Sequence, residues 1–155
     1  MEKTSAGKKV LEVPFDKSLL VNTCLPEFHY SDSYEIVIYT AKQFSTDYAL
    51  NQFLNLFPKV IFTRPVPDKF NLKDKVSIWE IVERNEKEIV LKSRFKILSF
   101  CNSFFMQNHV NGINIKVSTI VFYKSITGRA YFSLVLPFHK LLVKRYLKNL
   151  ASLLQ

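Results

Sequence analysis

A chain of 155 residues with 48% hydrophobic and 14% aromatic residues has the size and apolar content of one globular domain, 1–155, and lies outside the class of disordered proteins. The net charge is +9, and only three glycines occur, Gly7, Gly112 and Gly128. Because phosphate-cradling loops need several closely spaced glycines, Walker and dinucleotide-binding loops are excluded, and so is a G-x-S-x-G nucleophile elbow.

The first 25 residues predict a partly extended segment ahead of the main fold. They contain no apolar stretch as long as a signal peptide needs, and apolar runs such as 130–138 fall short of the roughly 20 residues that span a bilayer. We therefore expect a cytoplasmic protein. Cys24 and Cys101 have no metal-binding or redox spacing, so we expect two reduced cysteines in or near the core; a structural disulfide is the alternative.

Alternating apolar residues predict a half-buried strand over 30–40. A helix follows, which begins at a cap formed by Ser45 or Thr46 and carries apolar residues at helical spacing as far as Phe57. The proline-rich segment 64–68 predicts a loop that is too short to divide the chain into two domains.

The middle of the chain predicts consecutive strands. The first is the apolar run 76–82, and the second, 89–97, alternates apolar residues with Lys92, Arg94 and Lys96, which places these cations on one outer face.

A hairpin ends this series. Asn111-Gly112 predicts a type I′ turn, which needs positive φ at both central residues, between strands around 100–106 and 113–121. Because the strands follow one another in sequence, we expect an antiparallel sheet.

The last segment predicts one long amphipathic helix that begins near Thr127 and is kinked at Pro137. Its apolar stripe consists of Leu142, Val143, Tyr146, Leu147, Leu150 and Leu154, and its basic side of Lys140, Lys144 and Lys148. The fold class is therefore α+β, with a curved antiparallel sheet packed around a long C-terminal helix. We expect an apolar cavity between the two, lined by the helix and by Trp79, Phe95, Phe104 and Tyr123. The alternative is that these aromatic side chains fill the core completely.

The run Gly128-Arg129-Ala130-Tyr131-Phe132, followed by Pro137-Phe138-His139 and a basic helix, resembles the ending of a bacterial family called domain of unknown function 2867. Tyr30–Tyr34 is similar to that family's first strand and Trp79–Glu83 to a later one, so the resemblance covers about 26–150. It implies the START-like helix-grip fold of lipid-transfer proteins and polyketide cyclases. It implies no activity, because the family has no established one.

Four polar residues are candidates for a cluster that orients a ligand: Asp32, Arg129, Tyr131 and His139. Arg129 suits a bidentate contact with a carboxylate or phosphate, and the His139 imidazole can relay protons near neutral pH. Alternatively, Arg129 pairs with Asp32, and His139 binds the backbone carbonyl freed by Pro137. No catalytic residue is assigned, and no cofactor or metal is expected, since the other histidines lack ligand spacing.

All 13 acidic residues lie at or before Glu88, and residues 89–155 carry ten cations and no acidic residue. This half should attract phosphates or an anionic membrane surface; alternatively, it is a solvated face that only aids solubility.

Three functions stay open. The first is binding of a small hydrophobic or lipid-like ligand in the cavity. The second is a cyclase or hydrolase with His139 as acid or base. The third is contact of the basic half with an anionic surface. Nucleic acid is not expected, because the chain has no aromatic ribonucleoprotein motif and no recognition helix.

Overall fold

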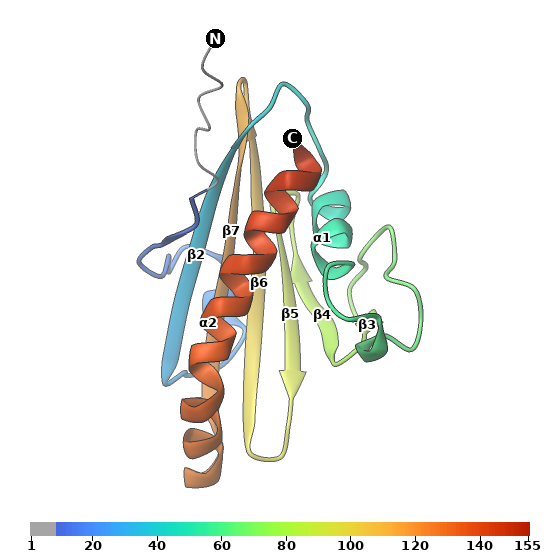
Figure 1. Cartoon of the computed structure of the whole chain (residues 1–155). Helices are drawn as coiled ribbons and strands as arrows, with labels where there is room; N and C mark the ends of the chain where they lie inside the picture. The colour runs from blue at the N-terminus through green and yellow to red at the C-terminus, as the bar shows by residue number, and fades with distance from the viewer. Residues whose placement is uncertain (1–8) are drawn as a thin grey trace.

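The computed structural model describes residues 9–155, in which one antiparallel sheet carries two α-helices on one face (Figure 1). The strands are β1 (Leu11–Glu12), β2 (Tyr30–Tyr39), β3 (Lys75–Val76), β4 (Trp79–Arg84), β5 (Glu88–Arg94), β6 (Leu98–His109) and β7 (Gly112–Tyr123). The helices are α1 (Thr46–Leu54) and α2 (Ile126–Leu154), and two 3-10 turns in the connections are η1 (Leu20–Thr23) and η2 (Lys59–Ile61). None of the helices in this part of the chain is long and apolar enough to cross a membrane.

The described strands form one sheet in the order β1-β2-β7-β6-β5-β4-β3, with every neighbouring pair antiparallel. β4 to β7 follow as hairpins, whereas β2 pairs with the distant β7 at the other edge of this meander. Helix α2 runs across the sheet, and α1 lies beside its C-terminal half (Figure 1). The predicted α+β class, with a long C-terminal helix packed on an antiparallel sheet, is confirmed.

Alternation along the strands divides the core between the two faces of the sheet. Tyr34, Ile36 and Ile38 of β2 face the helices, as their spacing predicts, and join the largest cluster of buried residues. β5 is buried on both faces, because Val90 packs into a second cluster on the far side, under the N-terminal segment. Lys92 and Arg94 share this far face, as predicted, but Val90 on the same face is buried, so the face is partly covered.

Three local predictions about the strands are wrong. The run 76–82 is not one strand: Ser77 has a φ of 57°, and the chain turns there between β3 and β4. β5 ends at Arg94, so Lys96 lies in the β5–β6 turn and not on an outer strand face with Lys92. The β6–β7 hairpin exists, but no residue of its turn has positive φ, which excludes type I′.

Gly112 has a different role from the one its turn position suggests. It pairs with His109 as the first residue of β7, and a Cβ there would lie 2.7 Å from the carbonyl oxygen of Ile38 in β2. The glycine therefore permits the close approach of two strands.

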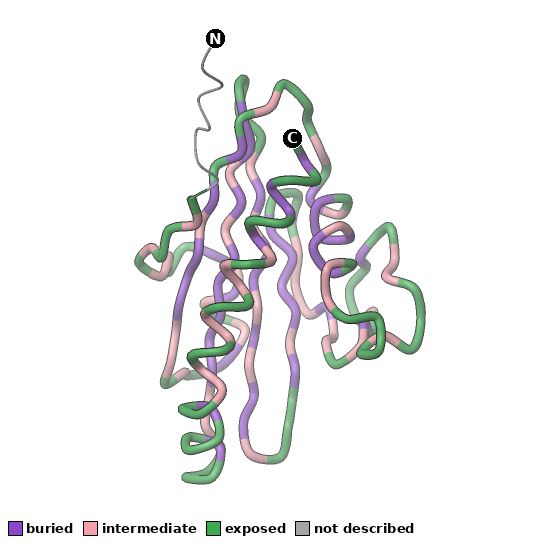
Figure 2. Tube along the Cα trace, in the orientation of Figure 1, coloured by how far each residue is buried: buried purple, intermediate pink, exposed green. Residues whose placement is uncertain are grey.

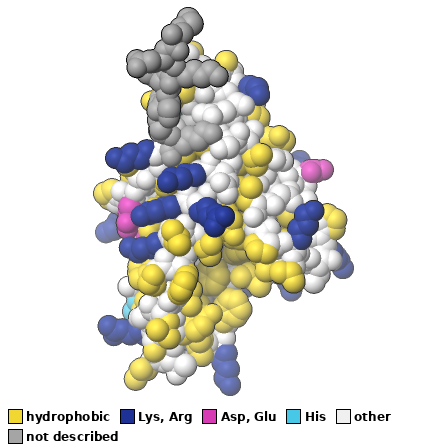
Figure 3. Space-filling view, viewed as in Figure 1, with side chains coloured by type: hydrophobic (Ala, Val, Ile, Leu, Met, Phe, Trp, Pro, Cys, Tyr) yellow, Lys and Arg dark blue, Asp and Glu magenta, His cyan; other side chains and the backbone are white. Residues whose placement is uncertain are grey.

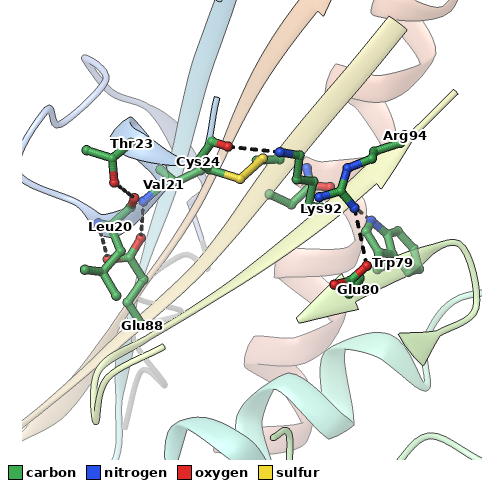
Figure 4. Close-up of a disulfide and its surroundings, with 11 residues drawn as sticks. Leu20, Val21, Thr23, Cys24, Trp79, Glu80, Glu88, Lys92 and Arg94 are labelled. Carbon is green, nitrogen blue, oxygen red and sulfur yellow. Dashed lines mark hydrogen bonds and ion pairs between the residues drawn. A yellow bond between two sulfur atoms is a disulfide. The ribbon is translucent and has the colours of Figure 1, made fainter. Parts of the chain in front are cut away.

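The N-terminal segment covers the far side of the sheet, where Cys24 forms a disulfide with Cys101 of β6 (Figure 4). The expectation of reduced cysteines is wrong, because η1 folds back over a strand that is distant in sequence. Next to the disulfide, the buried Glu88 carboxylate accepts hydrogen bonds from the backbone N–H groups of Leu20 and Val21 and from the Ser103 hydroxyl, at 2.8, 3.2 and 2.6 Å. Three donors satisfy a charge that would be costly to bury alone.

Helix α1 begins at Ser45, whose hydroxyl accepts a hydrogen bond from the Tyr48 N–H at 3.1 Å, as predicted. An ion pair fixes this helix to the sheet edge. Asp47 lies 2.8 Å from both terminal nitrogens of Arg84 in β4 and also accepts the Phe70 N–H at 2.8 Å. The Arg84 guanidinium holds the pKa of Asp47 below its usual value, with a further contribution from Phe70.

We predict that replacing both cysteines by alanine lowers the free energy of unfolding by about 4 kcal/mol. The disulfide closes a loop between positions 77 residues apart, and loss of this cross-link gives the unfolded chain more freedom. Urea denaturation of the oxidised, the reduced and the Cys24→Ala/Cys101→Ala proteins measures the difference. Reductant should destabilise the native protein and leave the double variant unchanged; equal stability of all three would contradict the prediction.

We also predict that Asp47→Asn lowers the free energy of unfolding by about 2 kcal/mol at neutral pH, because the charged hydrogen bonds to Arg84 are lost. The native pKa of Asp47 is lowered from 3.8, so its contribution is present above that pH and disappears as pH falls through the native value. The gap between wild type and variant in urea denaturation should therefore close in acid. Asp68→Asn, at an exposed carboxylate, is the matched control and should change stability little at either pH.

Candidate functional site

A pocket of about 700 Å³ lies between the middle of α2 and the sheet. The space-filling view shows a hollow surrounded by hydrophobic side chains beside the N-terminal half of α2 (Figure 3). Its walls come from α1, α2, the inner face of β4 to β7 and the β5–β6 turn. Aromatic residues contribute much of the lining: Phe53, Phe57, Trp79, Phe95, Phe100, Phe104, Tyr131, Phe132 and Tyr146.

The pocket exists because α2 is packed tightly only near its two ends (Figure 2). Near the C-terminus, Leu147, Leu150 and Leu154 are buried in the same cluster as α1. Near the N-terminus, a Cβ on Gly128 would meet the Ile97 carbonyl oxygen at 2.0 Å, so only glycine lets the helix lie against the β5–β6 turn. No residue between 133 and 146 is buried.

A row of polar side chains crosses the apolar inner face of the sheet. Asp32 of β2 is the register partner of Thr119 in β7, and Thr119 is the register partner of Asn102 in β6. The Asn102 amide donates to the Thr119 hydroxyl at 2.9 Å, and the Trp79 indole N–H donates to the Asn102 carbonyl oxygen at 3.1 Å. Asn102, Thr119 and Trp79 all line the pocket, so hydrogen-bonding groups lie on its floor.

At the β2 end of this row, His139 of α2 contacts Asp32. The distance from His139 Nε2 to Asp32 Oδ2 is 3.0 Å, and the Tyr30 hydroxyl donates to the same oxygen at 2.6 Å. Burial, and then the hydrogen bond to Asp32, raise the pKa of Tyr30, which keeps this hydroxyl protonated as a donor. In the tautomer of a neutral His139 imidazole that donates from Nε2 to Asp32 Oδ2, Nδ1 is an acceptor.

One oxygen in this group has no partner among residues 9–155. Asp32 is 6% exposed, and its Oδ1 is buried without a hydrogen bond. A buried carboxylate oxygen normally accepts hydrogen bonds, so Oδ1 is an acceptor beside the pocket wall formed by His139 and Thr119.

The structure brings together some of the candidate residues and separates others. Trp79, Phe95, Phe104, Tyr131 and His139 line the pocket. Asp32 is not part of the lining, but it is hydrogen-bonded to His139, which is. Both structural alternatives considered for Arg129 and His139 are wrong. Asp32 pairs with His139 and not with Arg129, and His139 Nε2 contacts Asp32 and not a backbone carbonyl.

Tyr123 and Arg129 lie outside the pocket lining. The Tyr123 ring stacks on His29 at 5.1 Å between centroids and packs on Phe132. Arg129 is exposed in the first turns of α2.

Sequence reasoning missed Asn102, Thr119 and Tyr30. Each is one polar residue in a strand, and nothing in its local pattern distinguishes an inward position from an outward one. The observed hairpin turns at 110–111 and so places Asn102 opposite Thr119 on one face. The predicted turn gave no such signal, because Asn111 and Gly112 as its central residues would pair Asn102 with Val121. Among the described residues, no group of three His, Cys, Asp or Glu side chains could hold a metal ion.

These observations define a class of protein in which an antiparallel sheet holds a long C-terminal helix over a pocket rich in aromatic side chains. Residues 44–146 match the family model described as "Protein of unknown function (DUF2867)", and the chain belongs to this family. The match begins after β2, so the likeness of Tyr30–Tyr34 to the family's first strand lies outside it. No curated protein and no solved structure matches the chain.

Proposed function

We propose that this protein binds a small hydrophobic or lipid-like molecule in the pocket between the sheet and α2. The pocket volume of about 700 Å³ supports this proposal above all, because it lies within the range of about 300–1,000 Å³ that ligand sites occupy. The lining is mostly apolar and aromatic, and the few polar groups are gathered in one row. The ligand we expect has an apolar body and one polar end that meets Asn102, Thr119 and His139.

The chemistry of the row defines that polar end. Asn102 and Thr119 are neutral, and the negative charge of Asp32 lies behind His139. A ligand hydroxyl can donate to His139 Nδ1 or accept from the Thr119 hydroxyl, whereas a second carboxylate would be repelled by Asp32. We therefore expect an alcohol, phenol, ketone or ester at this end.

The helix-grip arrangement supports a further part of the proposal, that the chain is a START-like protein. In that superfamily, lipid-transfer proteins and polyketide cyclases hold their ligands between a curved sheet and a long terminal helix. Here α1 is short and η2 follows it, so this side of the pocket has less helix than the arrangement implies.

We predict that Val135→Trp, which places a larger side chain in the pocket wall, lowers the affinity for the neutral dye Nile red at least about tenfold. The matched control is Leu134→Trp, at the neighbouring residue, which is 75% exposed and outside the lining. The control should bind within about twofold of wild type, since it leaves the pocket volume unchanged. Dye fluorescence titrations measure both affinities; equal losses in the two variants would contradict a pocket site.

The Asp32–His139 contact favours a second candidate function, an enzyme of cyclase or hydrolase type. A carboxylate that holds a histidine in one tautomer is a recurrent way to prepare a general base. Here Asp32 accepts a hydrogen bond from Nε2–H, and Nδ1 of the neutral imidazole can accept a proton from a substrate in the pocket.

The two functions differ in what His139 does. Native mass spectrometry and solvent extraction would first identify the bound molecule. If the protein is an enzyme that acts on this molecule, His139→Gln should lower turnover about 100-fold or more and change the affinity little. A carrier predicts no turnover in either protein. The matched control is His109→Gln, which changes an exposed histidine at the last residue of β6. Unchanged turnover in His139→Gln would exclude the enzyme.

A further inference from the structure

Helix α2 carries a second apolar stripe, which is exposed and reaches the pocket lining only at Tyr131. Tyr131, Leu134, Phe138 and Leu141 follow one another at spacings of three and four residues, so they lie on one side of the helix. They are 54%, 75%, 67% and 65% exposed. The core does not use this stripe, and contiguous exposed apolar residues of this kind mark an interaction surface.

The same side of the helix becomes cationic toward the C-terminus. Arg145 and Lys148 continue the spacing after Leu141, and neither forms an ion pair with the described residues. The whole of α2 has five Lys and Arg residues and no acidic residue. In the space-filling view, hydrophobic side chains gather over the N-terminal half of α2 and basic ones over the other half (Figure 3).

The apolar half of the stripe borders the mouth of the pocket. Tyr131 belongs to both, and the β5–β6 turn forms the opposite rim, with Phe95 43% exposed and Lys96 exposed beside it. Because Gly128 has no Cβ, this turn lies in close contact with the first turns of α2. One end of the molecule therefore presents apolar side chains from two elements, around the opening of an apolar pocket.

The positive charges on α2 favour one kind of binding partner for this surface over another. A second copy of the chain would bring another α2 with the same cations, and two such helices would repel each other. A bilayer with anionic headgroups is complementary instead. The rise of 1.5 Å per residue places Arg145 about 10 Å along the helix from Phe138, so the cations reach headgroup level when the apolar end enters the interface.

We propose that α2 and the β5–β6 turn dock on an anionic lipid membrane, with Tyr131, Leu134, Phe138, Leu141 and Phe95 in the interface and Arg145 and Lys148 on the headgroups. This orientation points the mouth of the pocket at the bilayer. The proposal does not depend on the proposed ligand, because the docking residues named here, apart from Tyr131 and Phe95, lie outside the pocket lining.

Vesicle flotation tests the proposal. The wild-type protein should float with phosphatidylcholine vesicles that contain about one-third phosphatidylglycerol, float poorly with pure phosphatidylcholine, and be released partly by salt. Leu134→Asp should lower the apparent affinity at least about tenfold, since it places a charge in the apolar interface. Arg145→Glu/Lys148→Glu should lower it by about the same factor, because the double change replaces two attractive headgroup contacts by repulsive ones.

Matched controls separate docking from loss of charge or of fold. Val110→Asp changes an 88% exposed valine in the β6–β7 hairpin, at the opposite end of the molecule, and should float as wild type does (Figure 1). Lys17→Glu/Lys87→Glu makes the same charge change at exposed lysines away from α2 and should cost less than about threefold. Val135→Trp should float normally even though it fills the pocket, which distinguishes failure of docking from failure of ligand binding.

Several outcomes would overturn the proposal. One is wild-type protein that does not float with anionic vesicles, and another is Val110→Asp losing as much affinity as Leu134→Asp. Flotation that responds to the charge variants and not to Leu134→Asp would show an electrostatic patch without insertion, which also contradicts it. A dimer in size-exclusion chromatography that Leu134→Asp dissociates would assign the stripe to a second copy of the chain.

Discussion

The way α2 is held at its two ends is the constraint on which the rest of the structure depends. The C-terminal end is packed by Leu147, Leu150 and Leu154 against α1, and the N-terminal end by Gly128 against the β5–β6 turn. α2 is one continuous helix of 29 residues, with Pro137 inside it, and its middle spans the inner face of the sheet between these ends without collapsing onto it. The hollow below is a consequence of these two fixed points, and aromatic side chains narrow it without filling it.

The Asp32–His139 contact joins the middle of the helix to β2 through a hydrogen bond. Burying the Asp32 carboxylate would be costly without donors, and Tyr30 and His139 supply them on one oxygen. The position of His139 in the pocket wall is thus tied to a charge that the sheet cannot expose to water. In an otherwise apolar pocket, this arrangement fixes where the polar end of a ligand can lie, and the Asn102–Thr119 pair extends it across the floor.

Sequence patterns predicted the elements that depend on local spacing. The alternation in β2, the Ser45 cap and the amphipathic C-terminal segment each involve residues within a few positions, where side-chain direction follows from the period. Pairings of distant residues do not follow from local spacing: Cys24 lies 77 residues from Cys101, and their disulfide was only the alternative. Asp32 and His139, 107 residues apart, were placed in one candidate cluster, but the direct contact between them was not predicted. Strand ends were also missed, since alternation continues through Lys96 although β5 stops at Arg94. The exposed stripe was readable from spacing, but two apolar stripes on one helix cannot be assigned to core or solvent without the sheet.

The excess of cations in α2 is best considered together with its two apolar faces. α2 is packed on the sheet by apolar residues near its ends, and this packing does not require that its outer side lack acidic residues. An outer stripe that is apolar at the pocket mouth and cationic beyond Leu141 matches the profile of an anionic bilayer from interface to headgroups. If the proposed ligand and the proposed docking both hold, Tyr131 and Phe95 would line the path between bilayer and pocket, and a ligand poorly soluble in water would not have to cross solvent.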